Sequence, residues 1–152
     1  MVNRHYNFIP GSFLILLLLG FSCTACAIDN PDSVDYVAKF EQSSMPYLKQ
    51  INNPNNTTIE NIAAYSKYRK FLEKEMSVAY GMLKTKLNKH EFSKLTISQK
   101  NWVHFRNSEF AFIDNNWTRK DFGSSYVISR GDYKCTIIKN RILELLNYAK
   151  NY

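Results

Sequence analysis

Three side chains that could take part in catalysis stand close together in the sequence: Trp102, His104 and Arg106. A histidine titrates near neutral pH and can move protons, and an arginine can stabilise a developing negative charge. This group would suit acid–base chemistry. However, half-exposed histidines on helices are far commoner than catalytic ones, and no recognisable nucleophile motif surrounds His104. An enzyme acting through His104 and Arg106 is therefore the weakest of three hypotheses.

Other kinds of catalytic or ligand site are poorly represented. The sequence has no HExxH motif, no cysteine–histidine cluster and no glycine-rich phosphate loop, so it predicts no metal and no cofactor. Asp114 and Asp121 could be paired carboxylates of the glycosidase type, but only their charge singles them out. Arg130-Gly131-Asp132 matches an integrin-binding tripeptide that recurs too often by chance to indicate a function. The sequence favours binding over catalysis.

Cys135 lies in the C-terminal part of the chain, far from the cysteines of the N-terminus. If the N-terminal cysteines are removed, it cannot form an internal disulfide. In an exported protein it would be buried and unreactive, paired with another chain, or a free thiol. Its neighbours Ile137 and Ile138 favour burial.

Residues 1–27 have the features of a secretory signal peptide. Arg4 precedes an uncharged apolar run over residues 13–21, and Ala25-Cys26-Ala27 is a small-x-small cleavage site. The run is short for a membrane span. The alternative is a lipoprotein modified at Cys23 or Cys26, but neither cysteine has the usual aliphatic residue three places upstream. We favour cleavage after Ala27 and expect export to the periplasm or cell envelope, with membrane anchoring only if the protein is lipidated.

The chain is basic and rich in aromatic residues, with a formal net charge of +7 and 14% Phe, Trp and Tyr. Such a composition can suit nucleic acid, but the export signal predicts a location away from it. Anionic partners in the envelope include cell-wall polymers, lipid headgroups and acidic proteins. Solubility alone is the simplest explanation of so modest a charge.

Helices are expected to position all of these side chains, because apolar residues recur at steps of three and four. A capping box at Thr57 and Glu60 predicts a long helix that ends near Asn88. A second box at Thr96 and Gln99 predicts another helix beginning there and ending near Trp117. Its expected core residues are Trp102, Phe105 and Phe110.

The remaining segments complete an all-α prediction. A C-terminal helix is indicated by the spacing of Ile138, Ile142, Leu145, Ala149 and Tyr152, whereas residues 118–132 predict an irregular loop. Pro46 divides residues 34–51 into one short helix and a second short piece. We therefore expect a small helical bundle of three main helices plus one or two short N-terminal helices. The expected divisions are a signal peptide (1–27), N-terminal helices with a linker (28–56) and the main helical domain (57–152).

The segment Leu95–Asn107 reads L-T-x-S-Q-x-x-W-x-x-F-R-N. It resembles the LprI-like lysozyme-inhibitor family of small exported bacterial proteins, which typically shows L-x-x-A-Q-x-x-W-x-x-[FY]-R-D. Residues 73–83, the glycine-serine run 123–125 and the spacing of Cys135, Arg141 and Leu145 are also similar to it, although the cysteine-to-arginine spacing is shorter here. The resemblance covers about residues 59–148. It implies structural roles for Gln99, Trp102, Arg106, Cys135 and Arg141.

The chain departs from the family pattern at three positions. Phe110 stands where relatives have a cysteine that pairs within the domain, and Tyr65 stands near the family's earlier cysteine. We expect Phe110 to fill its site by packing, because a lost disulfide typically costs about 2–5 kcal/mol that a larger core must recover. Asn107 replaces the family's aspartate, so any polar contact that it makes would be uncharged.

The resemblance implies a non-enzymatic protein that binds and inhibits a cell-wall hydrolase. The segment Phe122–Asp132, with Tyr126, Ser129 and Arg130, is the candidate plug for a sugar-binding cleft, although it could equally be a plain connector. Animal lysozymes are basic, so long-range charge does not favour them as targets. The alternative function is an immunity protein that neutralises a toxin delivered into the periplasm by a competitor, and a basic antitoxin would suit an acidic toxin. Both hypotheses predict a protein partner and no nucleic acid.

Overall fold

The computed structural model of the protein describes residues 34–152, and within this range all regular structure is helical. The helices are α1 (Tyr36–Ile51), α2 (Thr58–Lys86), α3 (Lys89–Asn116), the single turn α4 (Arg119–Phe122), the 3-10 turn η1 (Gly123–Ser125) and α5 (Tyr126–Lys150). The all-α prediction is confirmed, with three long helices and a shorter N-terminal one. The expected signal peptide and the cysteines at positions 23 and 26 lie outside the described residues.

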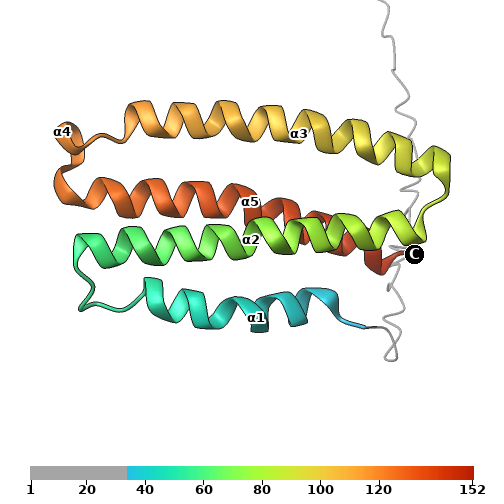
Figure 1. Ribbon diagram of the computed structural model, residues 1–152, viewed down its shortest axis with the longest axis horizontal. Coiled ribbons are helices and arrows are strands. Elements are labelled where there is room, and N and C mark those ends of the chain that lie inside the picture. Colours follow the sequence, from blue (N-terminus) through green and yellow to red (C-terminus); the bar gives the residue numbers. More distant parts are fainter. Residues whose placement is uncertain (1–33) are drawn as a thin grey trace, which may run out of the picture. The chain divides into compact units, whose positions relative to one another are not determined.

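Helices α2 and α5 lie side by side at the centre, with α1 on one side and α3 on the other (Figure 1). The periodic apolar residues of α2 and α5 meet between them, and the fully buried side chains include Leu72, Leu83, Ile138, Ile142 and Leu145. Helix α1 adds Phe40 and Tyr47, whose rings stack against Phe71 of α2. One continuous core therefore joins α1, α2 and α5. No helix in residues 34–152 combines the length and apolar character needed to cross a membrane.

The first capping box is confirmed and the second is wrong. Thr57 caps α2, with its Oγ1 accepting from Glu60 N at 3.3 Å while Glu60 Oε2 accepts from Thr57 N at 2.7 Å. Helix α3 begins two turns before Thr96, because Asn88 and Glu91 form the box that starts it. Helix α2 ends at Lys86, close to Asn88 as predicted, and Asn88 in addition caps the start of α3. Thr96 lies within α3, where its hydroxyl donates to Phe92 O.

Helix α1 continues through Pro46, where the sequence predicted a break. Proline cannot donate a backbone hydrogen bond to the carbonyl four residues earlier, at Gln42. Both Gln42 and Pro46 are exposed, so water can satisfy that carbonyl on the outer face of the helix. The opposite face carries the buried Phe40 and Ser44, and their packing holds the helix together across the proline.

The predicted loop over residues 118–132 is wrong for its second half. The turn between α3 and α5 closes at Ser125, and Arg130-Gly131-Asp132 lies within α5. Gly123 does serve as a turn residue, with a φ of 58° that side chains disfavour. Gly131 has a different role, because an added Cβ would lie only 2.3 Å from Tyr65 Cγ. This glycine permits the close contact of α5 with the Tyr65 ring on α2.

Helix α3 is only loosely covered by the rest of the bundle. Trp102 and Phe110 are half-buried and pack against the core, as expected. Phe105 is 53% exposed, so its predicted core position is wrong. Over its described length, α3 completely buries a single side chain, Ile113. One side of the helix faces solvent because no further helix packs against it within residues 34–152.

Candidate functional site

The residues first considered for catalysis do not converge. Arg106 donates from Nε and Nη2 to Asn107 Oδ1 at 3.2 and 2.9 Å, and its guanidinium lies over the Trp102 ring at 5.5 Å. Asn107 therefore supplies a neutral acceptor, where the family's aspartate would carry a charge, to hydrogen bonds whose donor is the charged guanidinium. His104 is exposed on the same helix. Residues 34–152 contain no group of three or more His, Cys, Asp or Glu side chains arranged to hold a metal ion.

Gln99 and Arg141, which are far apart in sequence, form the centre of a partly buried polar network. Arg141 is only 4% exposed and donates from Nε to Gln99 Oε1 at 3.0 Å. Its other nitrogens donate to Glu144 Oε2 at 2.6 Å and to Ser98 Oγ at 3.3 Å. The amide of Gln99 in turn lies 3.6 Å from Met76 Sδ. This network ties α3 to both α5 and α2.

Glu144 supplies the negative charge that partners the buried guanidinium. Burial works against ionisation, but hydrogen bonds from Tyr148 and Arg141 outweigh it and hold the pKa of Glu144 below its ordinary value. The Tyr148 hydroxyl lies 2.6 Å from Glu144 Oε1. Arg141 therefore keeps an ionised partner throughout the neutral pH range.

Cys135 is buried, as its apolar neighbours predicted, and it has no disulfide partner among the described residues. Its Sγ lies 4.0 Å from the carbonyl oxygen of Tyr65, the residue near the family's missing cysteine. Phe110 is partly buried and packs against the core cluster to which Cys135 belongs, with Lys134 Nζ 5.3 Å from its ring centroid. Burial raises the pKa of the Cys135 thiol to about 12, against a smaller opposing effect of Arg69.

We predict that Cys135 is unreactive in the folded protein. A raised pKa leaves almost no thiolate at neutral pH, and the thiolate is the species that attacks thiol reagents. Ellman's reagent should therefore label the native protein only at the rate of its unfolding, and label it at once in denaturant. Rapid labelling of native protein at pH 7 would show that the thiol is accessible and ionised.

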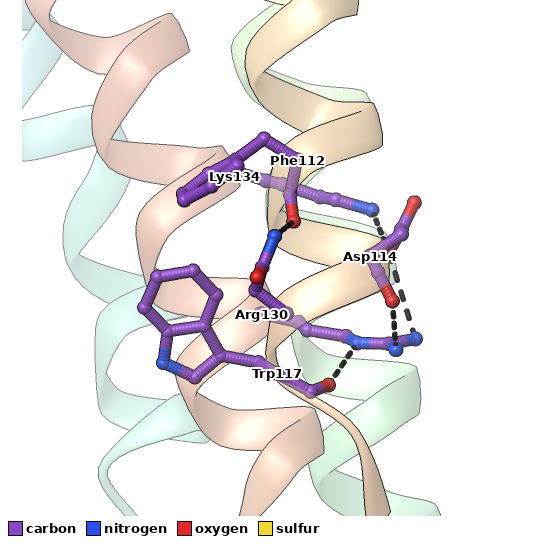
Figure 2. A network of polar contacts seen from close by, with 6 residues as sticks. Phe112, Asp114, Trp117, Arg130 and Lys134 are labelled. Carbon is purple, nitrogen blue, oxygen red and sulfur yellow. Dashed lines mark hydrogen bonds and ion pairs between the residues drawn. The ribbon is translucent and has the colours of Figure 1, made fainter.

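A polar clamp, formed by Asp114, Arg130 and Lys134, fastens the start of α5 to the end of α3 (Figure 2). Arg130 donates from Nε to Trp117 O at 2.6 Å and from Nη2 to the carbonyl of Asp114. Lys134 Nζ lies 2.6 Å from Asp114 Oδ1, and Arg130 Nη1 lies 3.6 Å from the same oxygen. Cations are favourable at the C-terminus of a helix, where carbonyl groups lack intrahelical donors.

The clamp changes the interpretation of the predicted plug residues. Tyr126, Ser129 and Arg130 lie in the first turns of α5 and not in a projecting loop. Arg130 is engaged by the clamp, and its guanidinium lies 4.9 Å from the Tyr126 ring centroid. The three residues are near one another, but Arg130 at least has a structural task here. The loop conformation predicted for residues 126–132 is therefore wrong, whereas contact of Tyr126, Ser129 and Arg130 with a partner stays a prediction.

An aromatic cluster, formed by Phe112, Trp117, Phe122 and Tyr133, covers the turn between α3 and α5. The Trp117 ring lies 5.8 Å from Phe112, 6.3 Å from Phe122 and 4.8 Å from Tyr133. Phe112, Phe122 and Tyr133 are nevertheless exposed. Exposed apolar patches commonly mark interaction surfaces. This cluster was not predicted from the sequence, although the density of aromatic residues between positions 110 and 133 was a signal for it.

Two exposed cations adjoin the aromatic cluster. Arg119 and Lys120 lie on α4, the single turn that also carries Phe122. Flat rings beside cationic side chains are typical of the residues that contribute most to protein–protein binding. The turn therefore combines apolar, cationic and well-fixed groups on one exposed segment.

A cavity of about 320 Å³ opens between α2 and α5, next to the clamp. Arg130 and Lys134 line it from α5, Arg69 lines it from α2, and Tyr65 and Tyr126 contribute rings. None of the residues that line it is acidic. The clamp thus presents cationic side chains to the cavity while its carboxylate, Asp114, lies outside the lining.

The family described as lysozyme inhibitor LprI matches residues 51–145, which is more than half of the chain. This chain belongs to the LprI family. Searches among curated proteins and among solved structures gave no significant match. The matched LprI region runs from the last residue of α1 into α5, so it includes the Gln99–Arg141 network, the clamp and the aromatic cluster. Almost all of α1 lies outside the match, although it packs into the same core.

Proposed function

We propose that this LprI protein is an exported, non-enzymatic inhibitor of a cell-wall hydrolase of the lysozyme type. The family match over residues 51–145 is the observation that carries the proposal. The periplasm or cell envelope, predicted from residues 1–27, is where such an inhibitor would meet its target. It would act by occupying the hydrolase and not by chemistry of its own.

The aromatic cluster together with Arg119 and Lys120 is the surface that we propose for this contact. Lysozyme-type clefts hold a pair of carboxyl groups flanking the bond to be cut. A cationic turn with flat apolar rings complements such a cleft in charge and shape. The attraction would be local, which matters because two proteins of net positive charge repel each other at longer range.

Hydrogen bonds and a ring contact within the turn order it in the absence of a partner. Thr118 Oγ1 lies 2.6 Å from Asp121 Oδ2, and Ser125 Oγ donates to Phe122 O at 2.7 Å. Phe122 is also nearly parallel to Trp117, with 15° between the ring planes. A segment that is already ordered loses less conformational entropy on binding, so more of the contact energy is available as affinity.

Replacing Phe122 with alanine should weaken inhibition by about tenfold, the loss expected for an aromatic hot-spot residue. Purified exported protein would be added to bacterial cell walls and a lysozyme, and lysis followed by turbidity. Phe105→Ala is the matched control, because Phe105 is similarly exposed but lies outside the cluster on α3. The control should inhibit like the natural protein. Equal inhibition by all three proteins would contradict the proposed contact surface.

The alternative function, an immunity protein against a delivered toxin, is favoured by the net charge of +7. A basic protein attracts an acidic target and repels a basic lysozyme at long range. The same exposed turn would then bind a toxin that attacks the cell wall. A toxin or secretion-system gene beside this one, together with protection of cells from that toxin but not from lysozymes, would favour this function.

A further inference from the structure

The cavity between α2 and α5 is lined by cationic side chains, and nearby carboxylates offset their positive charge only in part. Arg130 and Lys134 share the single carboxylate of Asp114. Asp132 and Glu73 lie near enough to raise the pKa of Cys135, yet neither lines the cavity. Three cations therefore border a space from which all carboxylates are absent, and an anionic ligand would complement it.

Arg69 is the cation with the weakest compensation. The nearest carboxylate oxygen, Glu73 Oε1, lies 3.9 Å from its Nε, which is too far for a hydrogen bond. That Nε is buried and has no hydrogen-bond partner among the described residues. The side chain as a whole is 41% exposed, and it lines the cavity. A guanidinium that lacks a hydrogen-bonded carboxylate can bind one in the bidentate geometry that arginine favours, donating two parallel hydrogen bonds to its oxygens.

The other residues that line the cavity suit a small cyclic molecule. Tyr65 and Tyr126 contribute aromatic surface, and Ile62 and Val127 contribute apolar surface. The volume of about 320 Å³ lies at the lower end of the range for small-molecule sites. We propose that this cavity binds a small carboxylated sugar, with its carboxylate on Arg69 and its ring between the tyrosines.

The test compares two sugars that differ by one carboxylate. N-acetylmuramic acid is N-acetylglucosamine with a lactyl ether that carries a carboxylate. Each would be titrated into the exported protein, with ¹⁵N labels, while the backbone amide shifts of the cavity residues are followed by NMR. The muramic acid should produce saturable shifts there and bind at least about tenfold more tightly than the neutral sugar. No saturation by the muramic acid, or equal binding of both sugars, would overturn the proposal.

Matched variants test the role assigned to Arg69. Arg69→Gln should lower the affinity for N-acetylmuramic acid by about tenfold, whereas Lys70→Gln, with the same change of charge on a neighbouring exposed residue, should not. An equal loss of affinity in both variants would show that only the net charge of the protein matters, and it would overturn the proposal. Should Arg69→Gln fail to fold, Arg69→Lys must bind more weakly than the natural protein, because lysine lacks the planar fork. These measurements contain no hydrolase, so their outcome is independent of the proposed inhibition.

Discussion

Replacing Arg141 with alanine should lower the free energy of unfolding by about 3 kcal/mol, at the lower end of what breaking a buried ion pair costs. The loss has three parts. Gln99 loses the donor to its Oε1, Ser98 loses a donor to its hydroxyl oxygen, and a gap opens where the buried guanidinium lay. Glu144 remains partly exposed, so water can solvate its carboxylate, which keeps the cost from being larger. Urea denaturation followed by circular dichroism would measure it.

Lys139→Ala is the control for this experiment. Lys139 lies two residues before Arg141 on α5 and pairs with Glu41 of α1 at 2.9 Å, but both side chains are partly exposed. An exposed pair of this kind contributes at most about 1 kcal/mol. If Arg141→Ala cost no more than Lys139→Ala, the network around Gln99 and Arg141 would not be a principal support of α3.

Replacing Gly131 with alanine should destabilise the protein by about 2 kcal/mol, even though alanine favours helices more than glycine does. The added Cβ would stand 2.3 Å from Tyr65 Cγ, so the ring or the α2–α5 contact must shift. Gly81→Ala is the control, because a Cβ added at that position on α2 meets no atom within 4 Å. At Gly81 no steric clash opposes the gain in helix propensity, so the alanine should raise the free energy of unfolding by about 0.5–1 kcal/mol.

A double variant would assign the cost at Gly131 to its stated cause. In a protein that already carries Tyr65→Ala, the Gly131→Ala change should no longer destabilise, because the clashing ring has gone. Thermal or urea unfolding of the four proteins in this cycle gives the interaction energy. A full penalty in the absence of the Tyr65 ring would show that the strain arises elsewhere.

The bundle and its core were predictable from the sequence because helical spacing identifies which residues share a face. Leu72, Leu83, Ile138, Ile142 and Leu145 are all buried in the structure. Phe105 shows the limit of this reasoning. Spacing identifies a common face but not whether another element covers that face, and α3 lies at the outside of the bundle.

The predicted helix boundaries were wrong where two local sequence signals competed. Both Asn88–Glu91 and Thr96–Gln99 fit a capping box, and the earlier one begins the helix. Residues 126–132 were predicted as a loop because two glycines and adjacent serines suggested a break. Gly131 is instead a helical residue that makes room for Tyr65, and no local pattern contains the residue on the other helix.

The candidate site depends on contacts between residues that the sequence separates. Arg130 reaches Asp114 across the α3–α5 turn, and Arg141 reaches Gln99 between α5 and α3. The family motif indicated that Gln99 and Arg141 matter but gave no contact between them. The aromatic cluster was missed because the sequence cannot show that rings packed together also remain exposed.

Titration of a purified lysozyme with the exported protein tests the central proposal most directly. The substrate should be a small soluble chitooligosaccharide, so that binding of the protein to cell walls cannot imitate inhibition. The proposal predicts that activity of at least one animal, phage or bacterial lysozyme falls in proportion to added protein and is abolished near equal molar amounts. If every lysozyme in such a panel kept full activity in an excess of the protein, inhibition of a lysozyme would not be its function.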